Sequence, residues 1–197
     1  MLEAHGAENI IHAAENSKKG FFERWLSRSC MAWTHLHDFP YFDNYELLTA
    51  MELNAIKTVT PHIKRVAFIG SGPLPLTSLC MLKQLRGSIF SCPKIMNIDC
   101  DPQAIEQSRT LCRLLGHRAA GMEFFCTKQA GDLSLIEYDV VFLAALAGLT
   151  QADKEDLVMS TLARMREDAV IVIRSVWGMR GLLYPVRSLR LDPVVSD

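Results

Sequence analysis

The feature that most constrains the fold is an alternation of short apolar runs with longer amphipathic runs, which starts at Lys64. The short runs have the length and composition of buried strands, and the longer ones have helical spacing. The predicted strands are 65–70, 94–99, 122–127, 138–146 and 169–175, and the predicted helices are 74–85, 102–115 and 151–166. Strands that alternate with helices form βαβ units, so the sequence predicts an α/β fold with a mostly parallel sheet.

The residues before this alternation predict only helix and loop. Helix-compatible apolar spacing is found in 7–14, 21–33 and 45–58. In the last of these stretches, the apolar side chains that repeat at three and four residues are Leu47, Leu48, Met51, Ala55 and Ile56. We therefore expect a helical N-terminal segment at 1–62 and a sheet domain at 63–197.

Composition narrows the class of ligand. A chain of 197 residues suits one domain with a sizeable core, and its net charge of −1 gives no basic field for nucleic acid. The six cysteines are scattered without a CxxC pair, which favours reduced thiols in the cytoplasm. No run is apolar for long enough to span a membrane, and the six histidines form no set of metal ligands. A small-molecule substrate is the expected partner, and homo-oligomerisation is left open.

A glycine loop joins the first predicted strand to the following helix. Gly70, Ser71 and Gly72 lie where backbone N–H groups and a helix N-terminus favour a polar ligand. Pro75 takes the place of the third glycine of the dinucleotide motif, which argues against a diphosphate cofactor. Asp99, at the end of the next strand, can accept from both hydroxyls of a ribose. This pattern suggests an adenosyl ligand such as S-adenosylmethionine, although loop glycines and acids at strand ends also occur in ordinary turns that bind no ligand.

A second acid follows in the segment "NIDCDP". Asp101 precedes Pro102, as an N-cap residue precedes proline at the first helical position, and Gly116 closes the predicted helix. We therefore weight Asp101 toward a helix cap and Asp99 toward ligand binding, while keeping both as candidate cofactor contacts.

Six segments in the same order resemble the nicotianamine synthase family. They are "LEAH" (2–5), "FPYFDNY" (39–45), "VAFIGSGPLPLTS" (66–78), "NIDCDP" (97–102), "YDVVFLAAL" (138–146) and "RSVWGMRGLLYP" (174–185). The resemblance implies a Rossmann-like S-adenosylmethionine domain beneath a helical segment. It also implies transfer of 3-amino-3-carboxypropyl groups from S-adenosylmethionine, which is a substrate, onto an amine. Three such units give nicotianamine, a metal chelator, with release of 5′-methylthioadenosine and without a required metal.

The resemblance also implies roles for residues that match the family motifs. Glu3 matches the catalytic base, and Tyr45 matches the tyrosine that orients the attacking amine, with Tyr41 and Asn44 beside it. Arg174 and Arg180 are candidates for binding substrate carboxylates, because guanidinium groups bind carboxylates with two hydrogen bonds. The candidate cofactor contacts are Gly70, Ser71, Gly72, Leu74, Pro75, Asp99, Asp101, Gln129, Ala144 and Leu146.

The match weakens at three places. The family normally has further helices before "LEAH" and about two further strands beyond the segment 182–197, so we expect a chain shortened at both ends with an open sheet edge. Gln129 stands near the place of a usual acidic contact to adenine. The alternatives are a transferase that adds a single aminobutyrate unit, an inactive homologue that only binds ligand, and an ordinary methyltransferase.

Overall fold

The computed structural model describes residues 42–86, 92–127, 133–144, 151–174 and 186–188. The chain forms two compact units, Met1–Phe42 and Asp43–Asp197. The helices predicted at 7–14 and 21–33 lie outside the described residues. The sequence suggested a boundary at residue 62, whereas the two compact units divide after Phe42. The reason is that the helix before the first strand packs on the sheet through Leu53 and Ile56.

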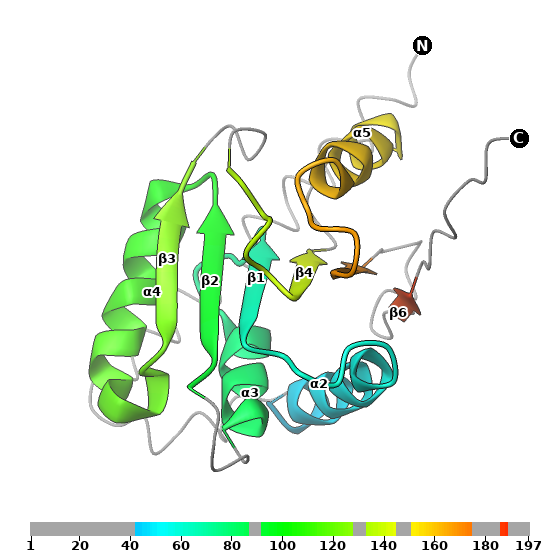
Figure 1. Ribbon diagram of the computed structural model, residues 1–197. Coiled ribbons are helices and arrows are strands. Elements are labelled where there is room, and N and C mark those ends of the chain that lie inside the picture. Colours follow the sequence, from blue (N-terminus) through cyan, green and yellow to red (C-terminus); the bar gives the residue numbers. More distant parts are fainter. Residues whose placement is uncertain (1–41, 87–91, 128–132, 145–150, 175–185, 189–197) are drawn as a thin grey trace, which may run out of the picture. The chain divides into compact units, whose positions relative to one another are not determined.

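The unit described here is an α/β fold with a six-stranded sheet, which confirms the predicted class (Figure 1). Its strands are β1 (Arg65–Ile69), β2 (Lys94–Asp99), β3 (Met122–Cys126), β4 (Val140–Leu143), β5 (Val170–Arg174) and β6 (Val186–Ser188). The order is β3-β2-β1-β4-β5-β6, and the first five strands are mutually parallel. Parallel neighbours in this order are typical of the doubly wound Rossmann arrangement.

The sixth strand was not predicted. β6 runs antiparallel to β5, with Ile173 opposite Arg187 and Arg174 opposite Val186. Along these residues the outer edge of β5, which we expected to be open, is paired. A strand of three residues with a central arginine gives no usable alternation in the sequence, so only its pairing identifies it.

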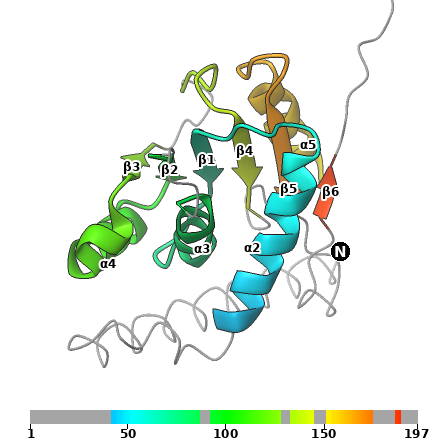
Figure 2. The same ribbon diagram turned by 60° about the horizontal axis from the view of Figure 1, so that its bottom comes forward.

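Helices cover both faces of the sheet. They are α2 (Phe42–Lys57), α3 (Leu76–Leu85), α4 (Pro102–Leu115) and α5 (Gln151–Leu162), with a 3-10 turn η2 (Gly116–Ala119) after α4. Figure 2 shows α2, α3 and α4 on one face and α5 on the other. The crossovers β1-α3-β2 and β2-α4-β3 move along the sheet in the same direction, and right-handed crossovers therefore place their helices together.

Alternation along the strands separates two cores. Val66 and Phe68 of β1 face the core that contains α2 and α3, whereas Ala67 and Ile69 face the core that contains α5. Phe68 stacks on Phe142 of β4, with ring centroids 4.4 Å apart. Both faces of the central strands are thus buried, as a parallel sheet requires.

Local chemistry sets the helix ends much as the sequence indicated. Asp101 accepts a hydrogen bond from the Gln103 N–H at 2.8 Å, Pro102 opens α4, and Gly116 closes it with a φ of 54°. The cap predicted at Asp101 is therefore confirmed. α3 begins at Leu76, two residues later than expected, because Pro75 is its N-cap residue.

The amino ends of β1 and β4 are joined through Asp139. Its Oδ2 accepts from the Lys64 and Arg65 N–H groups at 2.6 and 2.8 Å, and its Oδ1 accepts from Arg166 Nη2 at 2.6 Å. Burial raises the pKa of the Asp139 carboxyl, but hydrogen bonds from these three donors lower it by more. The pKa therefore lies below its ordinary value.

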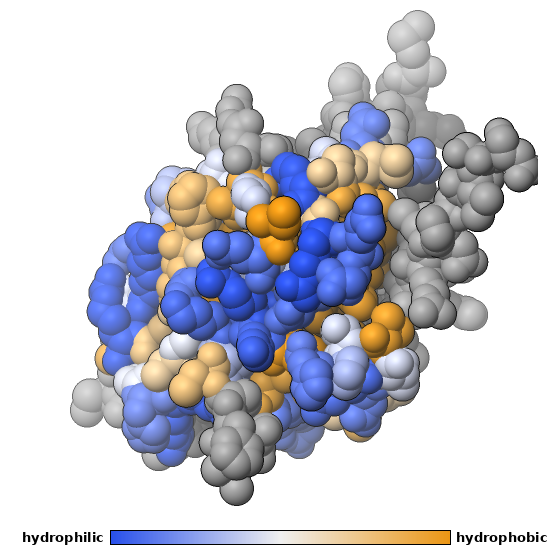
Figure 3. Space-filling view, in the orientation of Figure 1, coloured by the Kyte–Doolittle hydropathy of each residue, from blue (hydrophilic) through white to orange (hydrophobic). Residues whose placement is uncertain are grey.

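The surface is mixed in polarity. Figure 3 shows hydrophilic residues across much of the face that is seen in Figure 1, with separate hydrophobic patches between them. The exposed large apolar side chains among the described residues are Leu47, Met51, Val59, Leu114, Phe125, Ile136 and Met159. Among the helices described, none combines the length and apolar character needed to cross a bilayer.

Candidate functional site

The glycine loop lies against the end of β2. Gly70 and Gly72 have φ values of 79° and 68°, in the left-handed region that favours glycine. The Gly70 and Ser71 N–H groups both donate to the Ile98 carbonyl, at 2.8 and 3.1 Å. The loop therefore turns back over the neighbouring strand before the chain enters α3.

Asp99 holds the next part of this loop. Its Oδ2 accepts from the Gly72 N–H at 2.7 Å, and its Oδ1 accepts from the Asp101 N–H at 2.9 Å. A carboxylate has about four lone-pair positions, so two bonds leave further acceptor capacity. Ser108 on α4 donates to the Gly72 carbonyl at 2.8 Å, which fixes the loop from a second side.

Ser71, between the two glycines of the loop, carries a buried polar atom. Its Oγ is buried and has no hydrogen-bond partner within the part of the chain that the structure describes. A buried hydroxyl normally has a hydrogen-bond partner, so the Ser71 hydroxyl is available to bond a polar group of a ligand.

The loop occupies the topological switch point of the sheet. β1 lies between β2 and β4, and the chain leaves β1 toward β2 but later returns to β4 on the other side. Open α/β sheets bind ligands at this position, outside the carboxyl ends of the strands. Ala144, just after β4, donates to the Ile69 carbonyl at 2.9 Å, and so lies beside the loop.

The start of α3 completes this edge. Leu74 is buried at 8% exposure, and Pro75 leads into a helix whose N-terminus has no side-chain cap. An N-terminus of this kind favours negative charge. The structure therefore brings together seven of the predicted cofactor contacts at one edge, namely Gly70, Ser71, Gly72, Leu74, Pro75, Asp99 and Ala144. Gln129 and Leu146 lie outside the described residues.

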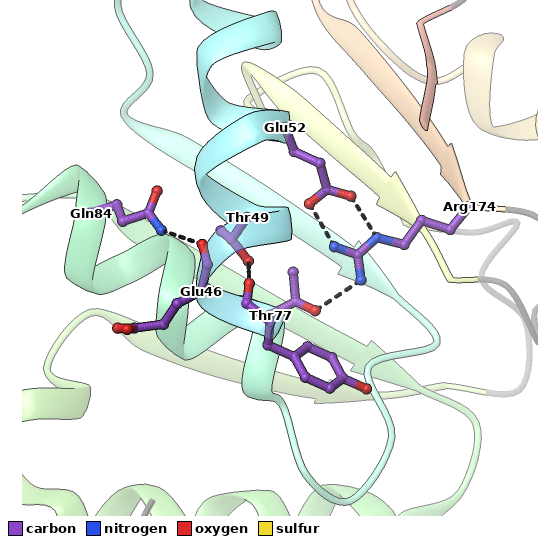
Figure 4. Close-up of polar contacts among 7 residues, drawn as sticks. Glu46, Thr49, Glu52, Thr77, Gln84 and Arg174 are labelled. Atoms are coloured by element: carbon purple, nitrogen blue, oxygen red, sulfur yellow. Dashed lines mark hydrogen bonds and ion pairs between the residues drawn. The ribbon is translucent and has the colours of Figure 1, made fainter. Parts of the chain in front are cut away.

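Arg174, at the end of β5, is held by two helical side chains (Figure 4). Its Nε and Nη2 donate to the two carboxylate oxygens of Glu52 at 2.9 and 2.6 Å, and its Nη1 donates to Thr77 Oγ1 at 2.8 Å. Its guanidinium carbon lies 5.6 Å from the centroid of the Phe142 ring. The Glu52 side chain is 0% exposed and that of Arg174 is 11% exposed. The sequence suggested a substrate carboxylate for Arg174, whereas the structure gives it an internal one.

Sequence reasoning missed Glu52 because it misjudged the inner face of α2. The predicted helix is confirmed, but Leu47 and Met51 of the apolar repeat are 63% and 62% exposed. Thr49 and Glu52 are buried instead. The missed signal is that Glu52 lies four residues before Ile56, an apolar position of the repeat, because a count of apolar residues does not weigh a charged one.

The N-terminal half of α2 carries further predicted residues. Asn44 is exposed and Tyr45 is half-buried, and the Tyr45 carbonyl accepts from Thr49 Oγ1 at 2.7 Å. The backbone carbonyl of Glu46 accepts from Gln84 Nε2 at 3.1 Å, which links α2 to α3 (Figure 4). Glu3, Tyr41 and Arg180 lie outside the described residues, so their predicted roles stay predictions.

The described residues contain no group of three or more His, Cys, Asp or Glu side chains arranged to hold a metal ion. Two thiols, one buried and one half-buried, lie on helices that cover the sheet. Burial raises the pKa of Cys80 on α3 and of Cys112 on α4 to about 12. Both thiols therefore stay protonated at neutral pH and behave as small apolar groups.

Sequence comparison relates the chain to one family. A family model described as nicotianamine synthase protein matches residues 7–193. Nicotianamine synthase of Solanum lycopersicum is 39% identical over 190 residues, which cover 91% of this chain and 55% of the relative. Nicotianamine synthase 2 of Oryza sativa subsp. japonica is 35% identical over 185 residues, with 91% and 55% covered. The chain thus spans about half the length of the curated relatives it matches.

Solved structures agree in fold. MtNAS in complex with MTA and tNA has a TM-score of 0.58 and 27% identity, and the alignment covers 79% of this chain and 53% of that one. A substituted MtNAS in complex with S-adenosylmethionine has a TM-score of 0.60 and 26% identity, with 79% and 55% covered. The plantazolicin methyltransferase BpumL, with a TM-score of 0.54 and 18% identity, shares the fold alone.

Proposed function

Because the chain belongs to the nicotianamine synthase family, we propose that it transfers the 3-amino-3-carboxypropyl group of S-adenosylmethionine onto an amine and builds nicotianamine. The reaction makes it a transferase of an alkyl group larger than methyl, with 5′-methylthioadenosine as the second product. S-adenosylmethionine is the substrate of the transfer, and the product, nicotianamine, chelates metals.

The observation that carries this proposal is the carboxylate of Asp99 bound to the Gly72 N–H at the switch point. Its remaining acceptor positions suit the two hydroxyls of an adenosyl ribose. The glycine loop and the start of α3 would then face the zwitterionic tail of S-adenosylmethionine. Pro75 at the third glycine position is consistent with a ligand that carries no diphosphate.

The reaction needs two things from the protein, which are alignment of the reacting atoms and removal of a proton from the amine. The nitrogen lone pair of the acceptor amine attacks the γ-carbon, and the bond between that carbon and sulfur breaks. The electron pair goes to sulfur, which becomes a neutral thioether. The amine loses a proton to a base, and Glu3 is the residue we propose for this role, with Tyr45 orienting the amine. Holding nitrogen and carbon in line supplies much of the rate.

Substrate carboxylates need fixed cationic partners. We propose Arg180 for this role, together with polar contacts from Tyr41 and Asn44. Arg174 is not included, because Glu52 and Thr77 already take three of the five N–H donors of its guanidinium. Separating it from a fully buried carboxylate would leave an uncompensated charge.

The test is to incubate the purified chain with S-adenosylmethionine and to identify the products by mass spectrometry. Methylthioadenosine with nicotianamine supports the proposal. Methylthioadenosine formed only when another amino acid is added indicates a single-unit transferase, and S-adenosylhomocysteine with a methylated acceptor overturns the proposal. Binding without turnover indicates an inactive homologue. A Glu3→Gln variant should bind S-adenosylmethionine normally and release methylthioadenosine at least tenfold more slowly.

A further inference from the structure

We propose that Glu52 and Arg174 are positioning residues for the step that uses Tyr45, because their ion pair fixes the rotation of α2 about its axis. The inference rests on the proposed function, from which it takes the role of Tyr45. It gives a role to Glu52 and Arg174, which touch neither the substrate nor the reacting atoms and act through Tyr45.

The first support is the spacing along α2. Tyr45, Thr49, Glu52 and Ile56 are separated by four, three and four residues, so they share one face of the helix. This face points inward, because Thr49, Glu52 and Ile56 are 0%, 1% and 4% exposed. Tyr45 therefore lies on the face that the ion pair anchors, about two turns, or roughly 10 Å along the axis, before Glu52.

The second support is that apolar burial alone does not choose this rotation. α2 has apolar side chains on both sides, since Leu53 and Ile56 are buried whereas Leu47 and Met51 are exposed. A rotation that buried Leu47 and Met51 would recover their apolar area but would expose Leu53 and Ile56, so apolar burial by itself does not fix the inner face. The charged Glu52 opposes this rotation, because it must stay on the guanidinium of Arg174.

The third support is where the ion pair is attached. Arg174 ends β5, and Thr77 lies in the first turn of α3, directly after the glycine loop. The pair therefore fastens α2 to the same edge of the sheet that carries Asp99. Two parallel hydrogen bonds define an orientation as well as a distance, which a single contact does not.

A double-mutant cycle tests whether Glu52 acts through Tyr45. The variants are Glu52→Gln, Tyr45→Phe and the combination, and the readouts are kcat and KM for release of methylthioadenosine. We expect Glu52→Gln to lower kcat at least tenfold with KM for S-adenosylmethionine changed less than threefold. In the Tyr45→Phe background the same change should lower kcat less than threefold. Equal losses in both backgrounds would overturn the inference.

The matched control is Glu46→Gln. Glu46 is on the same helix and forms an ion pair with Lys83 of α3, but these side chains are 30% and 62% exposed. An exposed pair contributes little. The control should therefore keep the parental kcat, and a loss as large as that of Glu52→Gln would mean that any ion pair between α2 and its neighbours has this effect.

A second readout does not depend on turnover. With 13C-labelled tyrosine, the ring signals of Tyr45 are assigned by their loss in Tyr45→Phe. We expect Glu52→Gln to shift them and Glu46→Gln to leave them in place. If the parental chain releases no methylthioadenosine, the proposed function fails, whereas the tyrosine signals still decide this inference. Unshifted Tyr45 signals in a folded Glu52→Gln protein overturn it.

Glu52→Gln leaves the charge of Arg174 buried and unpaired, and this can prevent folding. The combined variant Glu52→Gln with Arg174→Met removes both charges and is expected to fold, as thermal unfolding and circular dichroism will show. Its Tyr45 signals should still be shifted from the parental positions. Parental signals in this folded variant would show that apolar packing fixes the helix without the ion pair.

Discussion

The Asp99 carboxylate accepts a hydrogen bond from the Gly72 N–H at 2.7 Å, which joins the tip of β2 to the glycine loop that follows β1. The same side chain accepts from the Asp101 N–H at 2.9 Å. One carboxylate thus organises the loop, the start of α4 and the acceptor positions proposed for a ribose. A change at Asp99 is therefore expected to affect the ligand site directly.

Asp99→Asn should weaken S-adenosylmethionine binding at least tenfold in calorimetry. An amide retains one acceptor oxygen and gains a donor that faces the N–H group of either Gly72 or Asp101, so these N–H groups and the ligand compete for one oxygen. Glu106→Gln is the control, because Glu106 on α4 is 58% exposed and pairs with Arg113 at the surface. Unchanged affinity in Asp99→Asn would contradict the assignment.

Gly72→Ala should weaken binding by an effect of backbone conformation. A Cβ at this position would meet nothing within 4 Å, so the cost of about 1–2 kcal/mol comes from its φ of +68°. Gly116→Ala is a matched control, with a φ of +54° and equally open space at the C-terminal end of α4. Both variants should lower the free energy of unfolding, but only Gly72→Ala should raise the Kd for S-adenosylmethionine. Equal Kd values would contradict the loop's role.

Asp101→Ala should lower the free energy of unfolding by about 1 kcal/mol, because it removes the N-cap of α4. Thermal or urea unfolding measures this loss. We expect the affinity for S-adenosylmethionine to change less than threefold. A large loss of affinity without a change in stability would instead support Asp101 as a ligand contact.

Asp139 predicts how stability depends on pH. Its pKa in the folded protein lies below the ordinary value of about 4, so between these two values only the unfolded chain binds the proton. The stabilisation is therefore complete above about pH 4 and is lost as the pH falls through the folded pKa. Thermal unfolding from pH 3 to 7 should show the melting temperature falling in acid, with a smaller fall in Asp139→Asn.

Asp168→Asn is the control for this pH dependence. Asp168 also pairs with Arg166, at 2.7 Å, but its side chain is 79% exposed. The Asp168→Asn variant should therefore show almost the same acid dependence of the melting temperature as the parental protein. The same flattening in both variants would place the effect in Arg166 and its surroundings instead of in Asp139.

Much of the fold could be predicted because it follows from local patterns. The five parallel strands, α2, α3, α4 and α5 were expected from periodicity, and the Asp101 cap from residues that are neighbours in sequence. The glycine loop and Asp99 were recognised because strand ends at one edge of a parallel sheet converge. Seven predicted contacts lie together for this reason, although their role in binding stays a proposal.

Only the tertiary structure decided which side chains meet over long separations. Glu52 and Arg174 are 122 residues apart, and neither residue marks the other as its partner in the sequence. The inner face of α2 was misjudged because apolar residues occupy both of its sides, so periodicity leaves the rotation open until a buried charge finds its counter-ion. β6 likewise exists through its pairing with β5. The sequence by itself determined the five parallel strands, the helices between them and the edge at which the glycine loop and Asp99 lie, since these depend on local spacing. The rotation of α2 and the partner of Arg174 depend on contacts that form only when distant segments come together.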